Sequence, residues 1–220
     1  MKLIAIDTCT ETVSVSLYIN GKNFNHFLKG INKSSSIILS LCDELLTKTK
    51  TKIMDLNAII YTKGPGSFTG VRVCVAVAQG LSYGHNIPTI GISTLELMAF
   101  GAYLKYQNPK IAVALDARMN EIYWSLFDFS NEKINIIEDS LKKPAAVEKL
   151  SNDFIGVGNG FRVYEKILKS KTNIKDYYSE FYPKAENLIK ITLRKYKSVS
   201  EIKSDKYLAS ALYLRNKVTS

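Results

Sequence analysis

The strongest constraint on the fold is a stretch rich in glycine and small apolar residues, KGPGSFTGVRVCVAVAQGLSYG, at residues 63–84. A short apolar segment, AIIYT at residues 58–62, precedes it and predicts a buried strand. The tripeptide GPG at residues 64–66 then favours a sharp turn, because two glycines and a proline disfavour continuation of the strand. The chain must therefore reverse sharply between this strand and the segment that follows.

That following segment predicts a helix from about Gly70 to Tyr83. Ser67 and Thr69 are candidate N-caps, because a short hydroxyl side chain accepts hydrogen bonds from the free N–H groups of a first helical turn. The helix is apolar around most of its circumference, and only Arg72 and Gln79 are long and polar. A helix of this kind is buried on more than one side. One side can pack on the chain's own sheet, and the other requires a second layer or a second protein.

Two other interpretations of this stretch compete with a packing role. A glycine-rich turn before a helix N-terminus can bind phosphate, but GPGSFTG matches neither G-x-x-x-x-G-K-[ST] nor G-x-G-x-x-G. A membrane-spanning helix would need a longer apolar run than this one, without Arg72. Both alternatives are therefore weaker than burial against protein.

The composition is that of a globular protein, with 46% hydrophobic and 23% charged residues in 220. The net charge is +10, and each half of the chain carries +5, so no basic arm stands out. Solvated surface lysines explain this excess, and a diffuse positive field that favours an RNA-binding assembly is the alternative. The N-terminus does not resemble a secretory signal, and three widely spaced cysteines suit a reducing cytoplasm.

The rest of the sequence predicts the same order of elements twice. The first set has strands at residues 3–8, 11–20, 23–28, 58–62 and 88–93 and helices at 34–50, 70–83 and 93–106. The second set has strands at residues 111–116, 121–129, 134–141 and 153–157 and helices at 144–150 and 161–168. A loop at 173–179, a helix at 185–195 and a docked, partly extended segment at 207–215 follow.

This repetition predicts two α/β lobes, at residues 1–106 and 107–220, each with a mixed sheet flanked by helices. The arrangement is similar to the duplicated actin/Hsp70/sugar-kinase (ASKHA) fold. Asp7 and Asp116 each end a buried strand, where a carboxylate in such a fold either holds Mg²⁺ or phosphate or caps its own turn. The turns after both residues lack glycine, which weakens an ATPase interpretation.

Other candidate chemistry is sparse. His26 and His85 form no local metal-binding pair, and the sequence contains no G-x-S-x-G motif. Arg118 and Glu121 are expected to pair with each other or with a partner. The segment Tyr213–Asn216 is expected to dock as part of the tail.

Five blocks of the sequence, in this order, resemble the TsaB (YeaZ) family. They are the first strand with Asp7-Thr8, GPGSFTGVR (Gly64–Arg72) with AQGL (Ala78–Leu81), Gly91–Glu96, DARMNEIYW (Asp116–Trp124) and YLRN (Tyr213–Asn216). The resemblance implies an ASKHA fold and a role in adding the threonylcarbamoyl group to N6 of the adenosine beside the anticodon, in tRNAs that read codons beginning with A. It implies a non-catalytic subunit, because the related protein TsaD carries the metal-binding histidines.

The resemblance also implies the partners. The subunit is expected to pair with TsaD, to join a ternary complex with the ATPase TsaE, and to form a homodimer when alone. It is expected to reach tRNA through the complex, to be cytoplasmic, and to have no cofactor, metal or membrane contact, although a vestigial nucleotide site stays open. A small ASKHA-type ATPase or kinase is the alternative function, and a peptidase is a weaker one.

The resemblance places the partner interface on the first two helices. Carried onto this sequence, the interface comprises Ile38, Leu41, Ser67, Phe68, Thr69, Val71, Arg72, Val75 and Gln79. Val75→Arg is therefore expected to separate the subunits and to leave the fold intact. Two features depart from the family pattern: Lys33 stands where many relatives have histidine, and the given sequence ends soon after YLRN.

Overall fold

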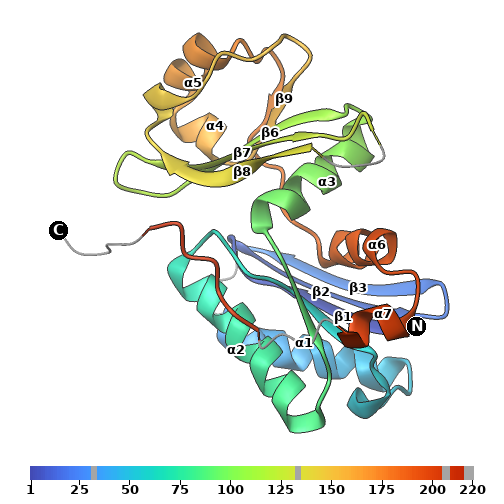
Figure 1. The fold of residues 1–220 in the computed structure, drawn as a ribbon. Helices are drawn as coiled ribbons and strands as arrows, with labels where there is room; N and C mark the ends of the chain where they lie inside the picture. The colour runs from blue at the N-terminus through green and yellow to red at the C-terminus, as the bar shows by residue number, and fades with distance from the viewer. Residues whose placement is uncertain (31–33, 132–134, 205–208, 216–220) are drawn as a thin grey trace. The chain divides into compact units, whose positions relative to one another are not determined.

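The computed structural model describes residues 1–30, 34–131, 135–204 and 209–215. The chain divides into two compact units. The first contains residues 1–97 and 183–212, and the second contains residues 98–182 and, within the described chain, 213–215. Each unit holds one five-stranded mixed sheet with helices beside it (Figure 1). The predicted α/β class and ASKHA-type architecture are confirmed.

The first sheet has the strand order β3-β2-β1-β4-β5. Its strands are β1 (Lys2–Asp7), β2 (Thr12–Ile19), β3 (Lys22–Lys29), β4 (Ala58–Thr62) and β5 (Thr89–Ile92). β1 runs antiparallel to β2 and parallel to β4, so Ile4 lies opposite Leu17 on one side and Ile59 on the other. A hairpin turn at Asn20-Gly21 joins β2 to β3, and both residues have positive φ, at 49° and 87°.

Helices cover both faces of this sheet (Figure 1). The helical segments of the first unit are α1 (Ser34–Lys48), the 3₁₀ turn η1 (Ile53–Asp55), α2 (Phe68–His85), α6 (Ala185–Lys195) and α7 (Val199–Ser204). The helix α3 (Thr94–Tyr106) begins in the first unit, and its residues from Met98 onward belong to the second. α1 and α2 pack on one face, where Ile4, Val15 and Ile59 are buried with them in one cluster. α6 packs against β1 and β2 on the other face.

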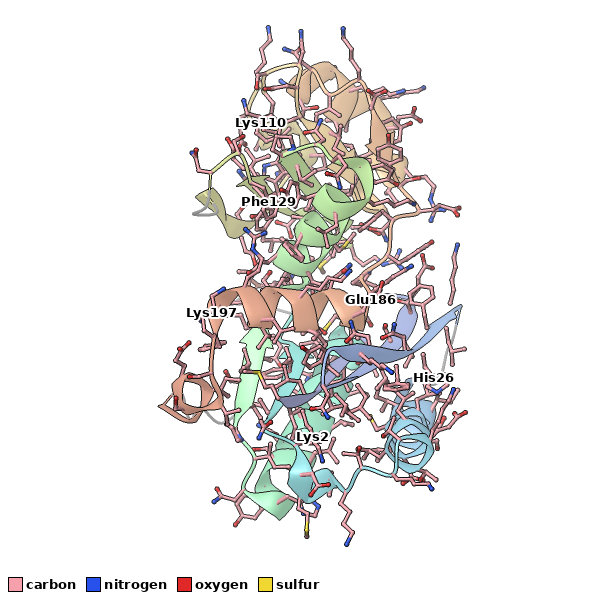
Figure 2. All side chains as sticks on the ribbon, turned by 90° about the vertical axis from the view of Figure 1, so that its right-hand side faces the viewer. Lys2, His26, Lys110, Phe129, Glu186 and Lys197 are labelled. Atoms are coloured by element: carbon pink, nitrogen blue, oxygen red, sulfur yellow. The ribbon has the colours of Figure 1, made fainter. Side chains whose placement is uncertain are left out.

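Polar side chains of the edge strand β3 contact helices on each face, through one hydrogen bond and one close approach of a histidine to a carboxylate. Asn25 Nδ2 donates to Glu186 Oε2 of α6 at 3.0 Å. His26 Nε2 lies 3.4 Å from Glu44 Oε2 of α1, and Figure 2 labels His26 and Glu186. The position of α6 changes the predicted lobe boundary, because residues 183–212 belong to the first unit and not to the second. The apolar side of α6, including Leu188 and Ile189, is fully buried there.

The second sheet has the order β10-β9-β6-β7-β8. Its strands are β6 (Lys110–Asp116), β7 (Ile122–Asp128), β8 (Asn135–Lys142), β9 (Ile155–Val157) and β10 (Tyr177–Tyr178), and its helical segments are η2 (Pro144–Ala146), α4 (Gly160–Val163) and α5 (Glu165–Thr172). Read from the other edge, this is the order of the first sheet, which confirms the predicted structural repeat. Trp124 and Phe161 centre its core, with ring centroids 6.2 Å apart.

Three predicted elements differ from the structure. The helix expected at 144–150 is only the short 3₁₀ turn η2, and the helix expected at 161–168 is two helices, α4 and α5. The loop expected at 173–179 contains β10, because Tyr177 and Tyr178 pair with β9 in parallel. Backbone pairing that joins distant segments decides this last element, and local sequence does not signal it.

Two glycines fix α2 on the turn that follows β1. Ser67 N donates to Cys9 O at 2.7 Å, and Thr8 Oγ1 donates to Gly70 O at 2.6 Å. A Cβ atom on Gly66 would lie 2.1 Å from Cys9 O, and one on Gly70 would lie 2.0 Å from Thr8 O. Gly66 and Gly70 of GPGSFTG therefore allow close backbone packing. Backbone carbonyl oxygens face both glycines, and because these oxygens repel phosphate, the contact argues against a phosphate-binding loop.

This contact predicts opposite effects for two glycines of the same helix. Gly70→Ala should lower the free energy of unfolding by about 3 kcal/mol, because the new methyl group displaces the backbone of Thr8. Gly80→Ala should raise it by about 0.5 kcal/mol, since its Cβ meets nothing within 4 Å and alanine favours the helix. Urea denaturation of both variants measures the difference, and equal stabilities would contradict the packing role.

Candidate functional site

The predicted interface residues divide between the core and the surface of the first unit. Ser67 is the N-cap of α2 and accepts from Gly70 N at 3.3 Å, whereas Thr69 lies inside the helix. The exposed members of the predicted set are Ser67, Phe68, Thr69, Arg72 and Gln79, and the buried members are Ile38, Leu41, Val71 and Val75. Lys33 lies outside the described residues.

Val75 needs a correction. Only 8% of its surface is exposed, and it belongs to the cluster that α1 and α2 form with the sheet. The resemblance to the TsaB family assigned Val75 to a partner interface, and the apolar pattern of this helix does not distinguish an internal face from an external one. The structure predicts that Val75→Arg disrupts the core, so this substitution does not test an interface.

The outer face of α2 combines large exposed side chains with small ones. Phe68 is 53% exposed and Tyr83 is 88% exposed, which is unusual for aromatic residues. The Arg72 guanidinium carbon lies 3.2 Å from the centroid of the Phe68 ring, so a cation–π contact orders both side chains. Between the two aromatic residues lie Ala76 and Gly80, both exposed. Spacings of about four residues bring all five onto one helical face.

A groove of about 670 Å³ lies beside α1. Exposed Leu39 lines it with Cys42, Leu46, Ile53 and Leu81, and the polar residues Asp43, Thr47, Lys50, Thr51 and Lys52 complete its lining. The predicted interface did not include Leu39, Ala76, Gly80 and Tyr83. The spacing of residues 68, 72, 76, 80 and 83 was the available signal for the outer face of α2.

Gln79 already has a partner within the chain. Its Nε2 donates to Ala209 O at 2.7 Å. The same C-terminal segment bonds Tyr61, whose hydroxyl accepts from Ser210 N at 2.8 Å and donates to Ser210 O at 3.1 Å. Leu212 N donates to Lys63 O at 2.7 Å. The docked tail expected at 207–215 is therefore confirmed for residues 209–212, and it engages the amide nitrogen of Gln79.

Asp7 caps its own turn, which was one of the two roles predicted for it from the sequence. Its Oδ1 accepts from Cys9 N at 3.3 Å and from Thr62 Oγ1 at 2.5 Å, and its Oδ2 is buried without a hydrogen-bond partner within the described structure. Burial raises the pKa of this carboxyl to about 6, against the opposing effect of the hydrogen bond from Thr62. Cys9 and Cys74 also contact the Thr62 hydroxyl, at 3.2 and 3.4 Å.

The three cysteines behave as buried thiols. Cys9, Cys42 and Cys74 are free, and burial raises the pKa of the Cys42 thiol to about 12. Within the described part of the chain, no cluster of three or more His, Cys, Asp and Glu side chains is arranged to hold a metal ion. None of the described helices is long and apolar enough to span a membrane.

Asp116 also caps its own turn, in the second unit. Its Oδ1 accepts from Arg118 N at 3.0 Å and from the Tyr164 hydroxyl at 3.2 Å. Arg118 Nη1 lies 3.3 Å from Asp116 Oδ2, and Arg215 Nη2 lies 2.7 Å from Glu121 Oε2. Arg118 and Glu121 therefore do not pair with each other, which was one of the two expected alternatives, because each pairs with another residue of the chain.

Comparisons of the sequence and of the structure with known proteins point to the same group of proteins. A family model described as "TsaD: tRNA N6-adenosine threonylcarbamoyltransferase" matches residues 29–218. The tRNA threonylcarbamoyladenosine biosynthesis protein TsaB of Escherichia coli (strain K12) is 34% identical and covers 99% of this chain and 96% of its own length. The protein of the same description from Haemophilus influenzae is 32% identical, and the match covers 100% of this chain and 95% of that protein. The solved structure of YeaZ from Pseudomonas aeruginosa has 26% identity and a TM-score of 0.86, and covers 97% of this chain and 99% of its own.

The raised pKa of Asp7 predicts how stability depends on pH. The folded protein binds this proton more tightly than the unfolded chain, so Asp7 costs no stability below about pH 4, its unfolded pKa. As pH rises above 4 and past 6, the ionised carboxyl should cost about 3 kcal/mol of unfolding free energy. Asp7→Asn should remove this cost, so the stability of the variant relative to the natural protein should increase between pH 4 and 7. Denaturant titrations at several pH values measure this difference, and a constant difference would contradict the raised pKa.

Proposed function

Because the chain belongs to the TsaB family of tRNA threonylcarbamoyladenosine biosynthesis proteins, we propose that it is a non-catalytic scaffold subunit of the complex that adds the threonylcarbamoyl group to tRNA. In this proposal it pairs with TsaD through α1 and α2, and TsaE joins the pair in a ternary complex. Alone, it forms a homodimer through the same surface. It works in the cytoplasm and reaches tRNA only through the complex.

The observation that carries this proposal is the outer face of α2. Phe68, Arg72 and Tyr83 are residue types that dominate the energetics of protein interfaces, and here they are exposed on a rigid helix. Ala76 and Gly80 lie between them, and these small side chains allow a partner helix to approach closely. Aromatic anchors at each end of a small-residue stretch fit a helix packed across α2.

The buried members of the predicted interface have a supporting role in this proposal. Ile38, Leu41, Val71 and Val75 hold α1 and α2 on the sheet, so they fix the relative position of the two exposed faces. The partner then contacts Ser67, Phe68, Thr69 and Arg72, together with Leu39, Ala76, Gly80 and Tyr83. Gln79 contributes its exposed atoms while its amide nitrogen holds the C-terminal segment.

Substitution of adjacent helix residues distinguishes the outer face from the core. Ala76→Arg should leave the melting temperature of the isolated subunit nearly unchanged and weaken pairing with TsaD roughly 100-fold or more, because burying an unpaired charge costs about 3–5 kcal/mol. Val75→Arg, one position earlier, should unfold or strongly destabilise the subunit. Light scattering measures the mass of the complex with TsaD, and circular dichroism measures whether each variant is folded. Normal pairing by a folded Ala76→Arg variant would contradict the proposed surface.

Reconstitution tests the scaffold role itself. TsaD, TsaE, tRNA and the threonylcarbamoyl-adenylate donor should form little modified nucleoside without this chain and much more with it. The chain with donor and tRNA alone should form none. Activity of TsaD and TsaE at the full rate without this chain would overturn the scaffold role, and transfer by the chain alone would overturn its non-catalytic nature.

A further inference from the structure

Residues 209–212, which we call the strap, run along α2 within the first unit (Figure 1). One bond joins the strap to the sheet, because Leu212 N donates to Lys63 O, directly after β4, at 2.7 Å. Another bond joins it to α2, because Ala209 O accepts from Gln79 Nε2 at 2.7 Å. The strap therefore connects the sheet to the side of the helix.

Tyr61 of β4 makes the central contact with the strap. Its hydroxyl accepts from Ser210 N at 2.8 Å and donates to Ser210 O at 3.1 Å. Burial raises the pKa of Tyr61, so the hydroxyl keeps its proton at neutral pH and serves both bonds. Tyr61 is only 3% exposed, so it reaches a partner protein only through the strap.

Two glycines from the sequence motifs make room for this arrangement. A Cβ atom on Gly91 would lie 2.7 Å from the Tyr61 hydroxyl, and one on Gly64 would lie 3.1 Å from Leu212 O. A side chain at either position would therefore displace the strap or the residue that holds it. The strap thus explains two motif glycines that the outer face of α2 leaves unexplained.

Gln79 places the strap at the border of the outer face of α2. It follows Arg72 by seven residues and precedes Tyr83 by four, so it lies on the same helical face as both. Its bond to Ala209 O sets the strap against that face. Ser210 is exposed, and the last two strap residues are half-buried. The strap therefore continues the exposed surface of α2.

The strap also has backbone groups available to another protein. Its bonds alternate between β4 and α2, as in an extended segment, in which successive residues direct their N–H and C=O groups to opposite sides. The N–H and C=O of Ala211 therefore point away from β4, and no residue that the structure describes bonds either group. A strand edge of this kind can bind the main chain of a second protein.

From these contacts we infer that Tyr61 is a positioning residue, and that the strap it holds is part of the surface that binds TsaD. TsaD is the single occupant, because the strap and the outer face of α2 are continuous. The sequence of the strap, ASAL, has no charged side chain and three small residues, so a partner backbone can approach closely. The inference rests on the proposed function and deepens it, because it adds a second element to the same interface.

Tyr61→Phe tests the positioning role. The variant keeps the ring and loses both bonds to Ser210, so amide hydrogen exchange of the strap should accelerate and TsaD affinity should fall about 10-fold. Tyr164→Phe is the matched control, because it removes a hydroxyl that bonds Asp116 in the second unit and should leave TsaD affinity within about twofold. Calorimetric titration with TsaD measures the affinity. A Tyr61→Phe variant that unfolds at lower urea concentration but binds TsaD normally would show a merely structural role and overturn the inference.

Ser210→Arg tests the strap as a contact surface. Tyr61 bonds only the backbone of Ser210, so this variant should fold with the strap in place, yet bind TsaD at least about 10-fold more weakly. Adding Tyr61→Phe should cause little further loss, because both changes act through the strap. Normal binding of TsaD by Ser210→Arg would remove the strap from the interface.

Ala76→Arg separates this inference from the proposed function. Loss of TsaD binding by Ala76→Arg, with normal binding by both strap variants, would overturn the inference alone. Normal binding by folded Ala76→Arg would overturn the proposed pairing surface and, with it, the inference. Weakened binding by all three variants supports both.

Discussion

The contact of Gly66 and Gly70 with the backbone of residues 8 and 9 is the constraint on which the first unit depends. It brings the start of α2 against the turn after β1, so closely that a Cβ atom on either glycine would clash with a backbone carbonyl oxygen. Because β1 and β4 are adjacent parallel strands, this contact fixes the helix across the sheet. Asp7 is buried beside it, and one face of α2 joins the core while the opposite face stays exposed.

The second unit meets the same constraint with a different sequence. Its strand β9 takes the place of β4, and Gly158 and Gly160 follow it as Gly64 and Gly66 follow β4. A Cβ on Gly158 would lie 2.3 Å from Ala114 O of β6, the strand that corresponds to β1. In both units, glycines in the turn after a parallel strand (β4 or β9) allow that turn to pack closely against the central strand, β1 or β6, or the residues that follow it. The two units therefore share this backbone packing although their sequences differ.

Two neighbouring parts of the surface of the first unit arise in different ways. The outer face of α2 is regular, since its exposed residues follow the helical repeat. The strap at residues 209–212 belongs to no helix or strand, and it depends on Gln79 and Tyr61, which lie 130 and 149 positions away in the sequence from the residues they bond. A regular surface tolerates local change, whereas the strap requires its distant side chains.

The sequence by itself determined the α/β class, the repeated order of elements, most helix and strand positions, and the family, because periodicity, turn residues and motifs are local signals. Tertiary structure decided which apolar face of α2 is internal, since Val75 and Ala76 are equally compatible with either side until the sheet is in place. It also decided the return of α6 to the first sheet, the pairing of β10 and the partners of Arg118, Glu121 and Arg215. These features join residues far apart in the chain, and short-range pattern contains no information about such contacts.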